Sequence, residues 1–172
     1  LRAGEILEIE NGAVRPASAK PLPPEMIPQF FPQEAIRVIL GPQEDRFTPK
    51  GIETFLTCEY RVSAQADRMG YRLEGPGIEH LRGADIISEP IPRGAIQVPG
   101  DGLPIIILWD GQVSGGYTKI ANAITADFDR LAQVVPGEKL HFQPITLEEA
   151  HEALREERTR MEWVRKMIEE SH

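Results

Sequence analysis

The sequence predicts a mainly β domain, built as a barrel or a sandwich, with two or three helices at its periphery. Three observations carry this prediction. Short apolar runs recur along the chain, glycine or proline interrupts most of the gaps between them, and few stretches have helical spacing. The chain has 172 residues, which fits one domain of ordinary size with some additional segments.

The first 34 residues are expected to lie outside this domain. Residues 1–9 read Leu-Arg-Ala-Gly-Glu-Ile-Leu-Glu-Ile, a pattern typical of the last strand of a preceding domain. Residues 10–34 contain six prolines, which remove backbone donors and predict an extended linker. We therefore expect this chain to be the C-terminal part of a longer polypeptide or a cleaved product.

The domain itself is expected at residues 35–150. Apolar and polar residues alternate at 35–40 and predict a strand. Thr48 is a typical helix cap and Pro49 suits the first helical position, so a short amphipathic helix is predicted up to Cys58. Short strands are expected next, at 60–63 and 70–74.

The central part of the domain contains the most apolar stretch. Residues 78–93 have no clear period and are expected to be irregular. Strands are predicted at 95–98 and 103–109, joined by a tight turn with the sequence Pro-Gly-Asp-Gly. The second of these strands is apolar on both faces, which indicates burial. It ends in polar and flexible residues, including the pair Gly115-Gly116, which we interpret as a turn.

The C-terminal part is expected to end the barrel and to add a helix. Residues 126–133 predict one or two helical turns, and 139–143 predict a final strand. Thr146 and Glu149 form a capping box, which predicts a helix that begins there. Residues 151–172 are then a helical extension, either solvated or in contact with another chain. The mixture of charges favours the solvated alternative.

Composition excludes several classes of partner. The formal net charge of −8 disfavours nucleic acids and anionic membranes, which prefer basic surfaces. The sequence has no apolar run long enough to span a bilayer and no signal peptide, so a cytoplasmic protein is expected. The single cysteine, Cys58, is predicted to be a small buried hydrophobe rather than a nucleophile.

Several motifs in register carry a resemblance to a known family, over roughly residues 40–149. The motifs are Gly-Pro-Gln-Glu-Asp-Arg-Phe (41–47), Asp-Arg-Met-Gly-Tyr-Arg-Leu-Glu-Gly-Pro (67–76), Gly-Ala-Asp-Ile-Ile-Ser-Glu (83–89), Gly-Ala-Ile-Gln-Val-Pro (94–99), Asp-Gly-Leu-Pro-Ile (101–105), Gly-Gly-Tyr-Thr-Lys-Ile (115–120) and Arg-Leu-Ala-Gln (130–133). Together they resemble the KipA family, also called allophanate hydrolase subunit 2 or the 5-oxoprolinase C subunit, which is related to biotin-dependent carboxylases.

The resemblance implies a closed cyclophilin-like β-barrel and a hydrolase function. It implies one component of a prokaryotic ATP-dependent 5-oxoprolinase, which opens 5-oxoproline to glutamate in a complex with a KipI-like B subunit, together with the A subunit. Two alternatives stay open: the carboxyltransferase component of a urea- or allophanate-type biotin-dependent carboxylase, and a regulatory module that antagonises KipI. The resemblance also implies that the complex uses ATP. Because the sequence lacks a phosphate-binding loop, we expect this chain to bind no cofactor and to be inactive alone.

Polar residues around Met69-Gly70 and after the strand predicted at 103–109 are the candidates for ligand binding. Two arginines beside a glycine can clamp a carboxylate, although solvated arginines are the alternative and Asp67 could be their structural partner. Gln97 lies on an otherwise apolar strand, so its amide needs hydrogen bonds from the protein or from a ligand. The four histidines are scattered and predict no metal site.

We expect these groups to converge at one mouth of the barrel and to bind a small amide or carboxylate. No catalytic residue is assigned by the sequence. The predicted binding residues are Arg68, Arg72, Gln97, Asp110, Gln112, Gly115, Gly116, Tyr117 and Lys119.

Overall fold

The computed structural model describes residues 35–169, together with Pro23, Pro24 and Ile27. Apart from these three residues, the predicted end of a preceding domain (1–9) and the predicted linker (10–34) fall outside the described residues. The chain divides into two compact units, of which Gln29–Thr159 contains the strands and the candidate site.

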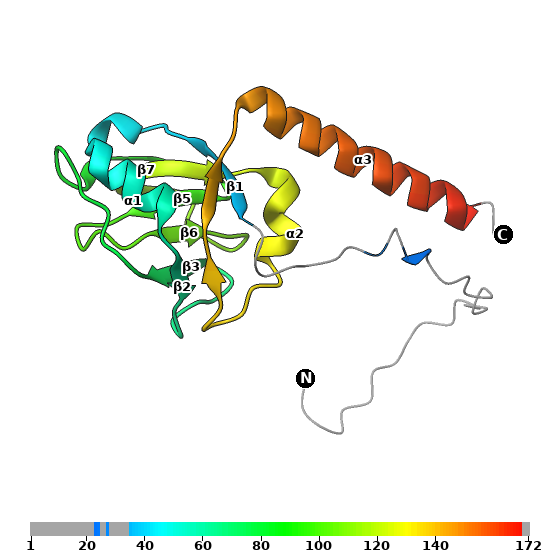
Figure 1. Ribbon diagram of the computed structural model, residues 1–172, viewed down its shortest axis with the longest axis horizontal. Coiled ribbons are helices and arrows are strands. Elements are labelled where there is room, and N and C mark those ends of the chain that lie inside the picture. Colours follow the sequence, from blue (N-terminus) through cyan, green and yellow to red (C-terminus); the bar gives the residue numbers. More distant parts are fainter. Residues whose placement is uncertain (1–22, 25–26, 28–34, 170–172) are drawn as a thin grey trace, which may run out of the picture. The chain divides into compact units, whose positions relative to one another are not determined.

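Nine strands form one nearly closed, barrel-shaped sheet (Figure 1), so the prediction of a mainly β barrel with peripheral helices is confirmed. The strand order is β8-β2-β3-β6-β5-β7-β1-β9, and β4 pairs with β7 outside this path. The strands are β1 (Ile36–Leu40), β2 (Tyr60–Val62), β3 (Gly70–Glu74), β4 (Asp85–Pro90), β5 (Ala95–Val98), β6 (Ile105–Ile107), β7 (Ser114–Ala123), β8 (Lys139–Leu140) and β9 (Phe142–Pro144).

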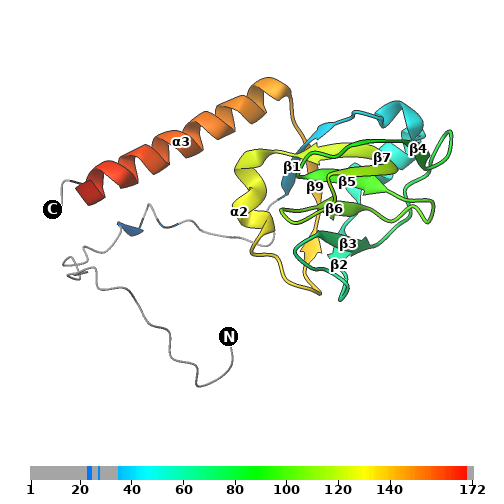
Figure 2. The ribbon, with the colours of Figure 1, turned by 180° about the vertical axis from the view of Figure 1, so that it is seen from behind.

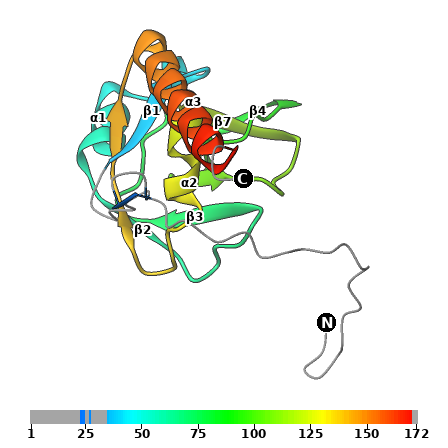
Figure 3. The same ribbon diagram turned by 90° about the vertical axis from the view of Figure 1, so that its right-hand side faces the viewer.

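Residues 139–144 bring the two ends of the sheet together by changing partners halfway. Strand β8 pairs antiparallel with β2, which lies beside β3 (Figure 3). Strand β9 follows after one residue and pairs in parallel with β1. The single strand predicted at 139–143 is therefore two short strands, because the segment pairs first with β2 at one end of the sheet and then with β1 at the other end.

Three α-helices accompany the sheet in the described residues: α1 (Pro49–Thr57), α2 (Phe128–Leu131) and α3 (Leu147–Glu169). Short 3₁₀ turns, η2 (Glu44–Arg46) and η3 (Thr125–Asp127), precede the first two. Helix α1 begins as predicted, because the Thr48 hydroxyl accepts a hydrogen bond from the Gly51 N–H at 2.9 Å. Its Phe55 ring stacks on Phe142 with centroids 4.5 Å apart, which packs α1 against β9 (Figure 1).

The start of α3 is the predicted capping box. The Glu149 N–H donates to the Thr146 hydroxyl at 3.2 Å, and the Thr146 N–H donates back to the Glu149 carboxylate at 2.7 Å. These hydrogen bonds from Thr146 hold the pKa of the Glu149 carboxyl below its usual value. One turn later, Ala150 and Ala153 pack against Ile124, which joins this end of the helix to the barrel.

Except in β4, alternate residues of the strands fill the barrel interior, and the residues between them face outward. Strand β7 departs from this alternation at one point. Ile96 of β5 lies opposite Ala121, but the next residue, Gln97, lies opposite Lys119, so Ile120 is an extra residue. Both Ile120 and Ala121 therefore join the core, whereas Lys119 is on the outer face. The interior includes Val38, Val62, Tyr71, Leu73, Ile96, Val98, Ile106, Leu140 and Phe142.

Two local predictions were wrong. The region expected to be irregular, 78–93, contains β4, which pairs with the outer end of β7 (Figure 2). Gly115 and Gly116 lie inside β7 rather than in a turn. Both errors have one cause: β4 is an exposed edge strand without a buried face, and it covers the glycine pair. The described helices include none that is both long and apolar enough to cross a bilayer.

Candidate functional site

A cleft of about 240 Å³ lies on the outer face of the sheet. Strands β3, β6, β5 and β7, which are neighbours in that order, contribute residues to it. Its position on the outer wall differs from the mouth of the barrel that the sequence suggested. The lining residues are Gln65, Asp67, Met69, Gly70, Arg72, Gln97, Ile105, Ile107, Gln112 and Tyr117.

The strand register explains which side chains meet in this cleft. Arg72 lies opposite Ile105, and Ile105 lies opposite Gln97. Gln97 in turn lies opposite Lys119. Directly opposed residues point to the same face of a sheet, so these four side chains form a row across four strands. The first three of them line the cleft.

Gln97 forms the floor of the cleft. Its side chain is 1% exposed, and its Oε1 accepts a hydrogen bond from Gln112 Nε2 at 3.4 Å. Its own Nε2 is buried and has no acceptor among the described residues. Buried amide donors are almost always paired, so this one is available to an acceptor that occupies the cleft.

The glycine pair of β7 makes room for this amide arrangement. A Cβ atom at Gly115 would lie 2.9 Å from Gln112 Nε2 and 3.1 Å from Gln97 Nε2. A Cβ atom at Gly116 would lie 3.1 Å from the Ile86 carbonyl oxygen of β4. The two glycines thus allow side chains of this chain and the backbone of β4 to approach β7 closely.

Arg72 and Tyr117 stand at the exposed rim of the cleft. Gln65 and Asp67 also line it, although neither was among the predicted binding residues. The Asp67 carboxylate accepts hydrogen bonds from the N–H groups of Met69 and Gly70, at 2.8 and 3.2 Å. Asp67 therefore holds the turn before β3 and does not partner the arginines. The polar residues at 65–68 were the feature of the sequence that could have indicated Gln65 and Asp67 as cleft residues.

Arg68 and Asp110 pair with each other and do not line the cleft. Arg68 Nε donates to Asp110 Oδ2 at 2.7 Å, and a second guanidinium nitrogen bonds the same oxygen. The Arg68 side chain is 85% exposed. Of the two arginines proposed as a clamp, Arg72 alone reaches the cleft, because neighbouring loops bring Arg68 to Asp110 instead.

Lys119 is buried beside the cleft, and its charge is balanced by a glutamate that does not line the cleft. Its ammonium donates to Glu89 Oε1 of β4 at 2.5 Å, and the Gln43 amide donates to the same oxygen at 2.6 Å. Gln43 also accepts the Lys119 backbone N–H at 3.0 Å. The hydrogen bonds from Lys119 and Gln43 lower the pKa of the Glu89 carboxyl. Glu89 and Gln43 were not predicted; both lie in motifs of the resemblance, at 83–89 and 41–47.

Acid should weaken the attachment of β4 through Glu89. Because its pKa is lowered in the folded protein, Glu89 contributes stability above its unfolded value of 4.5 and loses that contribution as the pH falls through the folded value. We expect Glu89→Gln to be less stable than the parent chain in urea at pH 7, with the difference shrinking below pH 4.5. Glu74→Gln, at an exposed glutamate of β3, is the control. A difference that does not change with pH would contradict the assignment.

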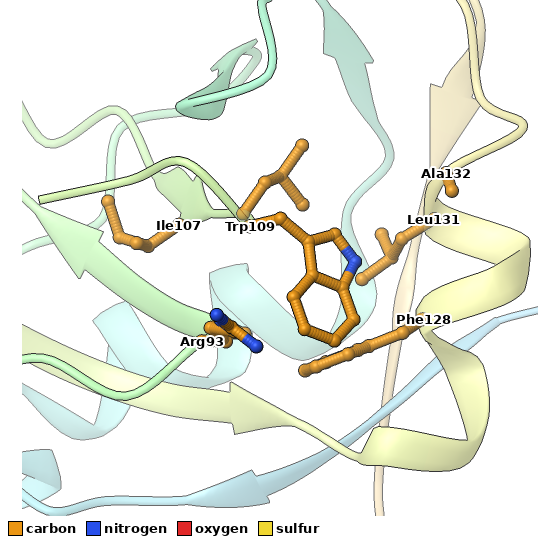
Figure 4. A pocket seen from close by; sticks show the side chains of 8 residues that line it. Arg93, Ile107, Trp109, Phe128, Leu131 and Ala132 are labelled. Atoms are coloured by element: carbon orange, nitrogen blue, oxygen red, sulfur yellow. The ribbon is translucent and has the colours of Figure 1, made fainter.

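A second, much smaller cavity lies next to the loop after β6, which carries Gln112. It measures about 30 Å³, the room of a single water, and lies beside Trp109 (Figure 4). The Arg93 guanidinium lies 4.0 Å from the centre of the Trp109 ring, and Phe128 meets the ring edge-on at 5.9 Å. These contacts fasten the loop after β6 to α2.

Comparisons with known proteins agree with this architecture. The family model described as carboxyltransferase domain, subdomain A and B, matches residues 1–144. The chain is 34% identical to the 5-oxoprolinase C subunit of Haemophilus influenzae over 140 residues, which cover 81% of this chain and 45% of that protein. It is 37% identical to the Escherichia coli C subunit over 118 residues, which cover 69% and 38%.

Solved structures show the same fold. The crystal structure of TTHA0988 superposes with a TM-score of 0.65 at 34% identity, covering 83% of this chain and 27% of that chain. The urea amidolyase of K. lactis superposes with a TM-score of 0.65 at 30% identity, covering 68% and 8%. The chain thus spans less than half the length of each of these proteins.

Proposed function

This chain belongs to the carboxyltransferase domain family, subdomain A and B, and we propose that it is the substrate-binding part of a 5-oxoprolinase C subunit. The relatives that carry this name support the proposal. One observation carries it to the level of residues: the cleft presents a guanidinium at its rim and, at its floor, an amide N–H donor that has no acceptor among the described residues. Those two groups suit 5-oxoproline, which has a carboxylate and an amide carbonyl.

The reaction is proposed to take place in a complex. The A subunit, together with a KipI-like B subunit, would complete the enzyme, and ATP would be used by that complex. This chain is proposed to bind no cofactor, since its sequence lacks a phosphate-binding glycine loop. Its residues would bind and orient the substrate carboxylate through Arg72 and the ring through the apolar side chains Ile105 and Ile107.

Arg72→Ala should lower the rate of ATP-dependent glutamate formation from 5-oxoproline by the assembled enzyme about ten- to a hundredfold. Removing a hydrogen bond to a charged ligand group costs about 1.5–3 kcal/mol, which corresponds to that loss. The control is Arg61→Ala, an exposed arginine of β2 that does not line the cleft. Equal rates for the two variants would refute the role of Arg72.

Carboxyl transfer is a second candidate function, favoured by the superposition on urea amidolyase. In that case the cleft would hold a urea-type acceptor, and a biotin carrier on another chain would deliver the carboxyl group. The assembled complex distinguishes the two functions. Glutamate formation from 5-oxoproline without biotin supports the oxoprolinase, and urea-dependent ATP hydrolysis that requires a biotin carrier supports the carboxylase.

A further inference from the structure

The cleft differs in chemistry from one end to the other. Gln97, at the buried floor, offers a neutral N–H donor. Arg72, at the rim, offers a charged and exposed guanidinium. They belong to strands separated by one strand, so their backbones are roughly 9–10 Å apart, and the apolar side chain of Ile105 lies between them. A complementary ligand is small and has an acceptor, an apolar middle and an anion in that order.

The difference in burial between the floor and the rim of the cleft determines which oxygen of the ligand binds at each end. A carboxylate at the floor would lose its hydration and gain one neutral donor, which leaves the charge poorly compensated. The nearest buried cation, Lys119, already pairs with Glu89. A neutral carbonyl oxygen loses much less on burial and satisfies the Gln97 donor. The carboxylate keeps contact with solvent and with Arg72 at the rim.

We propose that the cleft binds its ligand in one orientation, with a carbonyl oxygen on Gln97 Nε2 and a carboxylate on Arg72, and that Gln97 selects ligands that carry this carbonyl. The inference rests on the proposed function, because it takes 5-oxoproline as the ligand. A carboxylate without the carbonyl leaves the buried donor unpaired, so the site discriminates against it.

Three small carboxylates test this directly on the 172-residue chain by NMR titration. They are 5-oxoproline, 3-oxocyclopentanecarboxylate, which keeps the carbonyl but lacks the ring N–H, and cyclopentanecarboxylate, which lacks both. We expect the first two to bind with similar affinity and the third to bind about ten- to a hundredfold more weakly.

Two substitutions test whether Gln97 causes the preference for ligands that carry the carbonyl. Gln97→Met removes the donor and keeps the length of the side chain, and it should bring the three affinities to within about twofold of one another. Arg72→Ala should weaken all three ligands together. Gln143→Met, at an exposed glutamine of β9, is the matched control and should keep the preference.

Several results would overturn the inference. These are equal binding of cyclopentanecarboxylate by the parent chain, a carbonyl preference that survives Gln97→Met, and the absence of saturable binding by a chain with a folded spectrum. The assay of the assembled enzyme separates this inference from the proposed function. Turnover of 5-oxoproline with a preference independent of Gln97 refutes the inference alone. A preference that depends on Gln97 without turnover refutes the oxoprolinase alone.

Discussion

Replacing Phe142 with alanine should lower the free energy of unfolding by about 3–5 kcal/mol, the usual cost of emptying a buried phenylalanine site. Its side chain is 2% exposed, and its ring stacks on Phe55 at 4.5 Å and approaches Tyr60 at 6.0 Å. These partners come from α1 and β2, whereas Phe142 belongs to β9. The substitution would therefore leave a cavity between α1, β2 and β9, and a shift of any one of these elements would not fill it.

Thermal and urea denaturation of the 172-residue chain measure this effect. A loss of that size corresponds to a midpoint lower by roughly 6–20 °C. Val113→Ala truncates a side chain that is 83% exposed and should change stability by less than about 0.5 kcal/mol. A loss below about 1 kcal/mol for Phe142→Ala would mean that the rings do not pack as described.

Asp127→Ala should cost about 3 kcal/mol, the lower end of the range for breaking a buried ion pair. The Asp127 side chain is fully buried and accepts the Arg37 backbone N–H at 2.7 Å and Arg37 Nη2 at 2.6 Å. Arg130 Nη1 lies 3.6 Å from the same carboxylate. The cost stays at the lower end because Arg37 is partly exposed and water can solvate its freed guanidinium.

Two further variants separate charge from position in this cluster. Asp127→Asn keeps one acceptor oxygen for Arg37 and should lose less stability than Asp127→Ala. Asp129→Ala, at an exposed aspartate two residues later, should be nearly neutral. Urea denaturation at pH 7 checks all three. Equal losses at Asp127 and Asp129 would show that the buried pair does not anchor η3 to β1.

The features that sequence reasoning located well are those with a local cause. The caps at Thr48 and Thr146 depend on residues three positions apart, so the chain itself reveals them. Strands β3 and β5 have the predicted bounds because glycine and proline delimit them. Strand β4 has no buried face and little alternation, and edge strands of this kind resemble loops in sequence.

The candidate site depended on contacts that are distant in sequence. Gln97 could be recognised as needing partners, but the strand register that sets it beside Arg72 is a property of the closed sheet. Lys119 could be recognised as one of the polar residues that follow the strand predicted at 103–109, whereas its partner Glu89 lies 30 positions away on the unpredicted strand. Arg68 and Asp110 are recognisable in the sequence as charged residues, but the sequence does not show that they pair with each other across 42 positions.

The extra residue Ile120 adds a side chain to the core without changing which residues of β7 face the cleft. Because Ile120 has no residue of its own opposite it on β5, its deletion would leave Ala121 opposite Ile96 and Lys119 opposite Gln97. The side chains of β7 would then alternate without interruption, with Lys119 and Tyr117 on the outer face and Thr118 on the inner face. A single-codon deletion at this point would therefore remove one core side chain and keep the cleft. Homologous chains that keep this cleft should accordingly tolerate the loss of one residue at position 120.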